Sequence, residues 1–482
     1  MSLPFPEITR LLAEAVGSEH VSSSPVDTTS HALDYWPRAL IATRTGDWPC
    51  GPNWVVWPGA AAEVSHVLRI AASYAIPVIP YGGGSSMVGG AAPRGDRPWI
   101  VINSKRMCNI LDMDEVSMVV HVQTGIVGVE LEERLNARGF SLGHVPTSMT
   151  TATLGGWLST QSVGLLSSRY GRAGDLCLGI TAVLPDGQVV HTRVAPRRAT
   201  GPELMHLLVG SEGTLGVITA AHLRLHRLPL HRQFDSYRFS GVEPAVAAMR
   251  GCLVAGVRPL VARIQQDVRV RRELEGKERG IPASAEPQDP AARVLIMSFE
   301  GPPELVDTER EIMRDLATAA GGEALGPAPA RRWWGQRFAA AFRLGALLAQ
   351  PGTFADQVEV GATWRDLPRV HQRLVETLTG EGWHVQTVIE HARLEGACIS
   401  CFFWGDVGDL DEALRCYDAA WRHVAQACAD TGGRLGHVFG AGQHRAELLD
   451  DAARHRLTLL TQVKRKLDPA GIMNPGVLGT EP

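Results

Sequence analysis

The sequence lacks three features that would assign it to common classes of protein. No apolar run reaches the roughly 20 residues that a membrane-spanning helix needs. Roughly the first 30 residues lack a basic start followed by an apolar stretch, so we expect no secretory leader. The formal net charge is −4, without a basic excess or a charged block, which argues against a nucleic-acid partner or a charged tail. These absences predict a cytoplasmic globular protein.

Paired cysteines are also scarce. The eight cysteines are scattered, and Cys398 and Cys401 form the only Cys-x-x-Cys. They fall in an apolar run, residues 397–404, that is typical of a strand, where an offset of three places side chains on opposite faces. Because no second pair exists, we expect no zinc site. Free buried thiols in a reducing compartment are the simpler interpretation.

What the sequence does contain is a long chain of alternating strand and helix patterns. Its 482 residues exceed one ordinary core and predict two or more domains. The Asp186-Gly187 step predicts a hairpin turn. Strands are expected at 54–57, 77–80, 99–102, 118–122, 178–184, 188–192 and 217–225, and helices at 61–75, 127–138 and 447–467.

Glycine-rich turns become rare after about residue 228 and return near residue 432. This distribution predicts a first domain at 1–228, an inserted α+β cap at 229–431, and a C-terminal segment, 432–482, that completes the first domain. The polar segment 276–292 contains several glycines and prolines and predicts an exposed loop. The apolar segment 339–350 predicts a buried or cap helix, with a lipid-surface helix as the alternative.

The first glycine loop, residues 80–90 (PYGGGSSMVGG), follows a predicted strand. Consecutive glycines let the backbone approach a ligand and point several N–H groups at an anion such as a pyrophosphate. Met87 stands where a Rossmann turn needs its third glycine, and no Gly-Lys-Ser/Thr follows as in a Walker loop. A flexible loop without a ligand is the alternative interpretation.

Two further turns carry similar chemistry. The second glycine loop, residues 146–164, combines threonine and serine hydroxyls with Gly155 and Gly156. The third glycine loop, residues 210–218 (GSEGTLGVI), spaces three glycines at offsets of three ahead of a predicted strand. Each is compatible with an ordinary turn, but their joint occurrence indicates one extended ligand.

Together these segments resemble the FAD-binding flavoproteins of the p-cresol methylhydroxylase (PCMH) and vanillyl-alcohol oxidase type, and within them the alkylglycerone-phosphate synthases. The matching strings are residues 80–86, 155–160, 170–171, 175–176, 200–202 and 210–219, and the last is the most specific. Residues 468–476 resemble the closing flavin-side motif of that family. The resemblance implies an α+β fold: a PCMH-type FAD-binding domain of two α/β subdomains, with an inserted α+β cap.

The resemblance also implies which residues line FAD, with the first loop at the pyrophosphate and Ile218 near the ring system. These residues are Pro80, Tyr81, Gly82, Gly83, Gly84, Ser85, Ser86, Pro146, Thr147, Ser148, Met149, Thr150, Thr151, Ala152, Gly155, Gly156, Ser159, Thr160, Gln161, Ser162, Gly210, Ser211, Glu212, Gly213, Thr214, Leu215, Gly216, Ile218 and Asn474. Some members of the family bind FAD covalently through a histidine. The first loop here has Tyr81 and no histidine, so we expect non-covalent FAD.

On the substrate side the match is looser. Arg263 aligns with an arginine that contacts the substrate in the synthases, and its planar guanidinium suits a carboxylate or phosphate. A surface salt bridge is the alternative. The synthases have three consecutive histidines before a Gly-x-Gly. This chain keeps only the first of them, as His437, and Phe439 stands at the position of the third. His444, two residues beyond Gly442, is the other candidate proton acceptor.

Three more positions bear on the substrate pocket. His391 and Arg393 are expected to be polar pocket residues, and Ser400 aligns with a tyrosine of the synthases. The tryptophan pair at 333–334 is interpreted as core packing, with a pocket wall as the alternative.

The resemblance implies a FAD-linked oxidase or dehydrogenase for a small, anionic, hydroxylated substrate, with Arg263 holding its charged end and His437 or His444 accepting a proton. A synthase-like transferase without net redox is the second hypothesis, and a flavin-binding protein without chemistry is the third. A homodimer and peripheral membrane contact are compatible with the sequence. No nucleic-acid partner, bound metal or transmembrane segment is expected.

Overall fold

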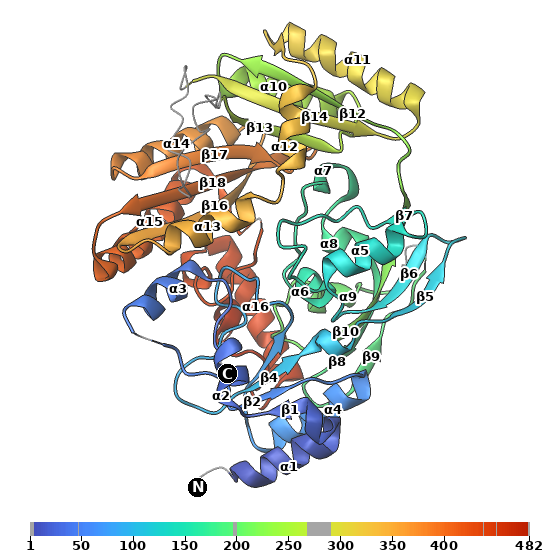
Figure 1. Ribbon diagram of the computed structural model, residues 1–482, viewed down its shortest axis with the longest axis vertical. Helices are drawn as coiled ribbons and strands as arrows, with labels where there is room; N and C mark the ends of the chain where they lie inside the picture. The colour runs from blue at the N-terminus through green and yellow to red at the C-terminus, as the bar shows by residue number, and fades with distance from the viewer. Residues whose placement is uncertain are drawn as a thin grey trace, which may run out of the picture. The chain divides into compact units, whose positions relative to one another are not determined.

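The computed structural model describes residues 4–46, 48–195, 200–267, 291–436, 438–449 and 451–480. Most of the predicted loop at 276–292, and His437, lie outside these residues. The chain divides into two compact units (Figure 1). Unit 1 comprises Met1–Gly164, Arg172–Leu228 and Val438–Pro482, and unit 2 comprises Leu165–Gly171 and Pro229–His437.

The first sheet of unit 1 leads into the first glycine loop. Strands β2 (Trp54–Val56), β4 (Ile100–Asn103) and β3 (Val78–Tyr81) run parallel, and β1 (Val21–Ser22) pairs with β2 in the antiparallel sense. Helices α1 (Phe5–Val16) and α4 (Ala61–Ser73) cover this sheet with the apolar stripe that their spacing predicts. The first glycine loop therefore begins at the end of a strand anchored in an apolar core.

The second sheet of unit 1 is antiparallel, and the predicted hairpin forms two of its strands. Gly187 has a φ of +85° in the turn between β8 (Cys177–Val183) and β9 (Val189–His191), as the glycine of an Asp-Gly turn is expected to have. A two-stranded ribbon, β7 (Phe140–Ser141) with β11 (His226–Arg227), lies beside helix α5 (Gly128–Asn136). The strand order is β5 (Ile110–Asp114), β6 (Val119–Gln123), β10 (Val217–Arg224), β8 (Cys177–Val183), β9 (Val189–His191).

Short helices and one long helix complete unit 1. The predicted helix at 447–467 is a 3-10 turn, Ala446–Leu448, followed by α16. The helices are α2 (Pro25–Ser30), α3 (Pro37–Arg44), α6 (Leu154–Ser159), α8 (Ala173–Leu176), α9 (Met205–Leu208) and α16 (Asp451–Leu467).

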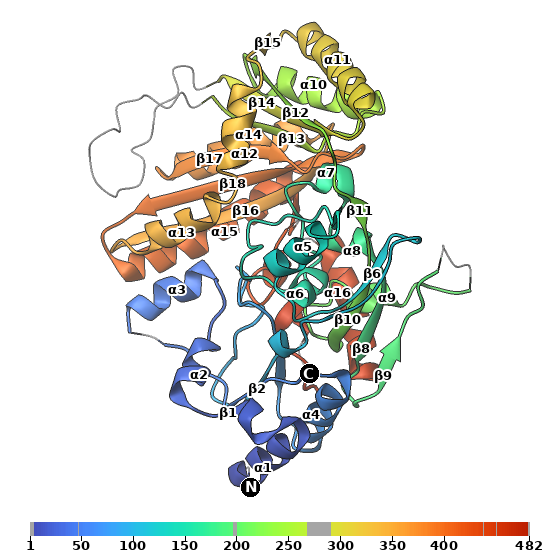
Figure 2. The same cartoon turned by 45° about the vertical axis from the view of Figure 1, so that its right-hand side comes forward.

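Unit 2 is built on one eight-stranded antiparallel sheet. Helices α10 (Val242–Val254) and α11 (Pro303–Ala319) lie along β12 (Arg232–Phe239) and β14 (Arg293–Glu300), as Figure 2 shows. Helices α14 (Leu367–Gly380) and α15 (Leu410–Thr431) pack on the other half of the sheet. The strand order is β15 (Glu323–Ala324), β12 (Arg232–Phe239), β14 (Arg293–Glu300), β13 (Val261–Gln266), β17 (His384–Glu390), β18 (Gly396–Asp406), β16 (Thr353–Thr363), β19 (Arg434–Leu435).

The two faces of this sheet are covered by different helices. Gln386 accepts a hydrogen bond from Arg343 of α13 (Ala340–Leu348) at 2.5 Å, whereas the next residue, Thr387, contacts His371 of α14 at 2.9 Å. Successive strand residues point to opposite faces, so α13 and α14 lie on opposite sides. Three leucines of α13 are buried, which favours the cap-helix interpretation of residues 339–350. Among the described residues, no helix is long and apolar enough to cross a bilayer.

Candidate functional site

The first glycine loop lies directly against the second. A β-carbon on Gly82 would lie 2.2 Å from the hydroxyl oxygen of Thr153, and one on Gly83 would lie 1.9 Å from the carbonyl oxygen of Thr151. Both distances are far below van der Waals contact, so only glycine permits the approach. The two loops therefore pack backbone against backbone although they are far apart in the sequence.

The first glycine loop also presents unused backbone donors. Within the described part of the chain, the amides of Gly82, Gly83, Gly84 and Ser85 donate to no protein acceptor. Gly84 has a φ of +64°, the left-handed conformation that turns successive N–H groups toward one side. This arrangement fits an anionic group such as the pyrophosphate of a dinucleotide.

The third glycine loop is hydrogen-bonded to the second. The amides of Gly210 and Glu212 donate to the carbonyl oxygens of Leu158 and Ser159 at 3.0 and 2.9 Å. Gly213 has a φ of +77°, which is strained for a residue with a side chain, and a β-carbon there would lie 3.0 Å from the ring of Pro80, which opens the first loop. The three loops thus touch one another pairwise within unit 1.

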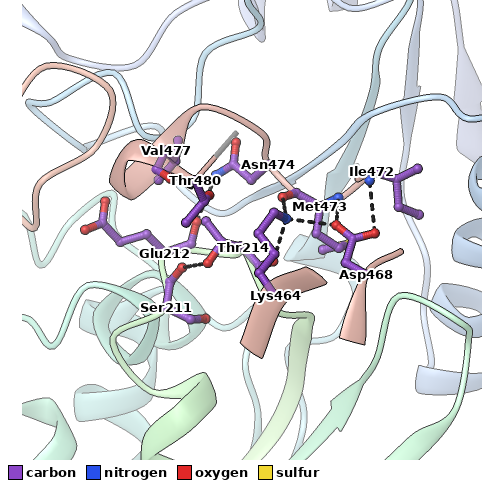
Figure 3. A network of polar contacts seen from close by, with 10 residues as sticks. All are labelled: Ser211, Glu212, Thr214, Lys464, Asp468, Ile472, Met473, Asn474, Val477 and Thr480. Atoms are coloured by element: carbon purple, nitrogen blue, oxygen red, sulfur yellow. Dashed lines mark hydrogen bonds and ion pairs between the residues drawn. The ribbon is translucent and has the colours of Figure 1, made fainter. Parts of the chain in front are cut away.

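A buried ion pair fixes the C-terminal closing segment, residues 468–476, to the third loop (Figure 3). The Lys464 ammonium donates to the Asp468 carboxylate at 2.8 Å, to the Thr214 carbonyl oxygen at 2.9 Å and to the Met473 carbonyl oxygen at 2.6 Å. Asp468 in turn accepts the amides of Ile472 and Met473 at 3.0 and 2.8 Å. Every donor of the ammonium and both carboxylate oxygens therefore have partners.

Asn474 joins the closing segment to the first and third loops. Its side-chain amide donates to the carbonyl oxygens of Gly90 and Glu212, at 2.9 and 2.8 Å. Its backbone amide donates to Val78 at 2.9 Å, so the segment continues the sheet beside β3. Asn474 was predicted as a FAD contact; in the structure its side chain holds the first and third loops together.

The C-terminal glycine loop, residues 438–443, contacts the first and third glycine loops. Its amides at Ala441 and Gly442 donate to the Glu212 carboxylate, both at 2.8 Å. The amide of Gln443 donates to the carbonyl oxygen of Val88 at 3.0 Å, which ties this loop to the first. His444 follows directly, with its ring 5.5 Å from that of Trp36.

The other predicted FAD contacts lie on the same elements. Thr153 caps α6, because its hydroxyl accepts the amide of Gly156 at 3.3 Å. The carbonyl oxygens of Met149 and Ala152 each accept an amide from the start of α5 at 3.0 Å. Ile218 lies in β10. Four glycine loops and the closing segment therefore meet in unit 1 and leave backbone donors for a ligand.

Two family models match this chain. One, described as "FAD binding domain", covers residues 52–193, which hold the first two loops. The other, "FAD linked oxidases, C-terminal domain", covers residues 228–478, more than half of the chain. The chain belongs to the FAD-linked oxidases. It is a FAD-dependent enzyme. The unused amides of the first glycine loop are compatible with binding the pyrophosphate of this cofactor.

Individual relatives of this chain differ in the activities that their names state. An alkyldihydroxyacetonephosphate synthase of Dictyostelium discoideum is 27% identical over 98% of this chain and 80% of its own length. A mitochondrial D-lactate dehydrogenase (cytochrome) of Arabidopsis thaliana is 28% identical, over 89% of this chain and 73% of its own length. At this identity the reaction is not fixed by likeness alone.

Solved structures confirm the predicted fold class. A structure of alkyldihydroxyacetonephosphate synthase superposes with a TM-score of 0.81 at 26% identity, covering 98% of this chain and 85% of its own. p-Cresol methylhydroxylase superposes with a TM-score of 0.77 at 16% identity, covering 99% and 97%, which shows the fold alone. The chain therefore has the α+β, PCMH-type architecture that the motifs predicted.

Two buried carboxylates lie beside the first glycine loop in unit 1. Burial raises the pKa of Asp34 to about 7, although the amides of Ala91 and Trp36 donate to it at 3.3 and 3.1 Å. Burial likewise raises the pKa of Glu212 to about 7, and the negative charge of Asp34 adds to this rise. Burial and then Asp34 raise the pKa of Tyr81 to about 12, so this phenol is neutral at physiological pH.

The raised pKa of Asp34 gives a testable pH dependence. Because the folded pKa of about 7 exceeds the ordinary value of 3.8, the stabilisation is complete below about pH 4 and is lost as pH rises through 7. We expect Asp34→Asn to reduce the fall in the free energy of unfolding between about pH 5 and 8. Denaturant unfolding of the FAD-loaded protein measures it, with the exposed Asp186→Asn as the control. An unchanged slope in Asp34→Asn would contradict this account.

In unit 2 the structure brings Arg263 and His391 to one carboxylate. Arg263 donates to Glu390, the residue opposite it on β17, and His391 Nε2 lies 3.9 Å from the other Glu390 oxygen. His391 Nδ1 lies 2.8 Å from the hydroxyl of Ser167 in α7 (Ser167–Tyr170). Arg263 is largely buried, with 17% of its side chain exposed, so the surface-salt-bridge alternative does not describe it.

The remaining predicted positions of unit 2 are more dispersed. Arg393 lies in the turn between β17 and β18, where its carbonyl oxygen accepts the indole N–H of Trp364 at 3.1 Å. Ser400 is buried on β18 and accepts a hydrogen bond from Gln357 at 2.6 Å. Trp333, in α12 (Ala328–Gly335), packs against a small apolar cluster, as the core-packing interpretation predicts. Its ring also lies 5.4 Å from the guanidinium carbon of Arg263.

Sequence reasoning did not single out Asp34, Lys464 or Glu390. For Lys464, the signal was the i,i+4 spacing with Asp468 just before the closing motif. For Glu390, it was the position next to His391. Asp34 has no local signal, because only its burial distinguishes it.

Proposed function

We propose that this protein oxidises the hydroxyl-bearing carbon of a small anionic substrate. Unit 1 would hold FAD through the unused amides of the first glycine loop. Unit 2 would hold the substrate through Arg263. The likeness to the D-lactate dehydrogenase, whose name states an anionic hydroxylated substrate, supports this assignment.

The observation that carries the proposal is the set of contacts that fixes the guanidinium of Arg263. Its Nη1 donates to Glu390, its Nε lies 3.4 Å from the Gln265 side-chain oxygen, and its guanidinium lies over the Trp333 ring. The planar fork is therefore held in one orientation, and its Nη2 donates to no described residue. A fixed guanidinium with a free edge suits a carboxylate or phosphate, because such groups bind Arg through parallel hydrogen bonds.

The chemistry then needs one acceptor for hydride and one for a proton. FAD supplies the first, because its reactive ring accepts a hydride from a C–H bond. The chain supplies the rest: Arg263 orients the substrate through its charged end, and a histidine takes the hydroxyl proton as the carbonyl forms. His444 is the candidate whose surroundings are described, and His437 directly precedes the C-terminal glycine loop.

A transferase resembling alkyldihydroxyacetonephosphate synthase is the second candidate. It is supported by 27% identity along nearly the whole chain. Against it, Phe439 stands at one of the three expected histidines, and Ser400 aligns with the expected tyrosine. A serine hydroxyl that bonds to Gln357 cannot replace a phenol as acid or base at neutral pH.

An anaerobic screen separates the two candidates. We expect a 2-hydroxy acid such as D-lactate or glycolate to bleach the flavin absorbance and yield the 2-oxo acid. A transferase would instead need a long-chain alcohol as co-substrate. It would exchange the ester-linked acyl group of acyl-glycerone phosphate for the ether-linked alkyl group of the alcohol, releasing a free fatty acid with its flavin oxidised at the end. Turnover of the second kind without any bleaching by hydroxy acids would replace the oxidase assignment.

Arg263→Ala should weaken binding of the anionic substrate by about 30- to 100-fold while FAD stays bound, because a charge-assisted pair is lost. The KM for the substrate found in the screen and the flavin spectrum measure the two effects. Arg238→Ala is a matched control, because this β12 arginine also pairs with carboxylates, Asp267 at 2.7 Å and Glu323 at 2.9 Å. Equal KM values in the two variants would remove Arg263 from the substrate site.

A further inference from the structure

Glu212 is fixed at its backbone by two of the flavin-side segments. Its amide donates to Ser159 in the second loop at 2.9 Å, and its carbonyl oxygen accepts the Asn474 side chain at 2.8 Å. Its φ is +49°, a left-handed conformation that is costly for a residue with a side chain. The surrounding bonds therefore hold Glu212 in a conformation that aims its side chain away from its own loop.

Both carboxylate oxygens of that side chain bind the C-terminal glycine loop. One carboxylate oxygen accepts the Ala441 amide and the other the Gly442 amide, each at 2.8 Å. A β-carbon on Gly440 would lie 2.5 Å from the same carboxylate, so the turn closes around it. Bonds of this kind, from backbone N–H groups to an ionisable carboxyl, are among the stronger hydrogen bonds of proteins.

The C-terminal glycine loop, which Glu212 holds, directly precedes the candidate proton acceptor His444, two residues after Gly442. The other candidate, His437, lies outside the described residues. Arg445, which is buried, donates to the Val438 carbonyl oxygen at 3.3 Å and so closes the same loop from its other end. The positive charge of Arg445 and the two amides favour the ionised form of Glu212, which burial opposes.

We infer that Glu212 is a positioning residue that couples the flavin-side loops to the loop bearing the proton acceptor. The inference rests on the proposed function, because that function assigns a proton acceptor to residues 437–444. Glu212 itself touches the cofactor loops through its backbone and the acceptor loop through its carboxylate. Its side chain should therefore govern the rate of substrate oxidation more than the affinity for FAD.

The test compares Glu212→Gln with the wild-type protein in the FAD-loaded state. A glutamine keeps one acceptor oxygen and places an NH2 group against an amide donor, so one of the two bonds is lost. We expect the amides of Ala441 and Gly442 to exchange with deuterium about tenfold faster or more. We expect D-lactate or glycolate, whichever reduces the wild type, to reduce the flavin about 10- to 100-fold more slowly, with KM and FAD affinity nearly unchanged.

Glu132→Gln is the matched control. Glu132, on α5, is also a partly buried carboxylate with a raised pKa that accepts a backbone amide, from Leu142 at 3.2 Å. Its hydrogen-bond partners are Ser141 and Leu142 rather than the C-terminal glycine loop. The control should leave both the exchange at 441–442 and the reduction rate at wild-type values. Glu212→Asp, whose shorter side chain cannot reach both amides, should give intermediate values.

Three results would overturn the inference: slow exchange at 441–442 in Glu212→Gln, fast exchange with a wild-type reduction rate, or equal rate losses in Glu132→Gln. Failure of the proposed function has a different signature. In that case no hydroxy acid reduces even the wild-type flavin, and the role of Glu212 toward a proton acceptor falls with it. The exchange measurement would still report whether its carboxylate holds the turn.

Discussion

Gly83→Ala is expected to yield a protein that retains little FAD. The new β-carbon would lie 1.9 Å from the Thr151 carbonyl oxygen and 2.6 Å from its carbonyl carbon, so two backbones rather than a flexible side chain must separate. Overpacking of this kind costs about 1–3 kcal/mol, and here it moves the amides that face the ligand. We expect FAD to bind about 10- to 100-fold more weakly. Flavin fluorescence titration of the apoprotein measures it.

Two controls separate this effect from general destabilisation. Gly380→Ala, at the end of α14, places a β-carbon where no atom lies within 4 Å, and should leave FAD affinity unchanged. In Gly82→Ala the clash is with the Thr153 hydroxyl, 2.2 Å away, and adding Thr153→Ala should restore much of the lost affinity. If Gly83→Ala binds FAD as the wild type does, the first loop is not the anion site.

The glycine loops could be predicted from the sequence because the requirement for glycine is local. A run such as Gly82-Gly83-Gly84 after a strand, or Gly210 and Gly213 before one, marks a backbone that bends or approaches another chain segment closely. The structure shows both effects, in the clash that a β-carbon on Gly83 would make and in the positive φ of Gly213. The hairpin at Gly187 was predictable for the same reason. That the loops meet is a tertiary fact, and the resemblance to a family implied it.

Two features of unit 2 could not be predicted from nearby residues. Unit 2 includes Leu165–Gly171, a segment within the predicted first domain, because Tyr170 donates to Glu300 and Ser167 contacts His391. These partners lie more than a hundred residues away along the chain, and nothing near Tyr170 indicates them. The pairing of Arg263 with Glu390 likewise depends on the register of β13 against β17. Register is set by the whole sheet, so residue patterns alone left the salt bridge of Arg263 open.

The burial of Lys464 could not be predicted from the sequence either. Replacing this residue should have the second large effect, a loss of stability. Lys464→Met keeps most of the side-chain volume but removes all three bonds of the ammonium, to Asp468, Thr214 and Met473. Asp468 would remain buried without its cation. Breaking a buried pair in this way typically costs about 3–5 kcal/mol. We expect a loss of that size in the free energy of unfolding, measured by urea denaturation followed by circular dichroism.

The same bonds tie the third glycine loop to the closing segment, so the variant should also bind FAD more weakly. Lys466→Met, a change two residues along α16, should alter neither quantity and is the matched control. Adding Asp468→Asn to Lys464→Met should recover part of the stability, because it removes the unpaired charge while keeping an oxygen to accept the amides of Ile472 and Met473. A double variant less stable than Lys464→Met would show that the lost cation is not the main cost. In that case the bonds to Thr214 and Met473, rather than charge pairing, would be what holds the closing segment in place.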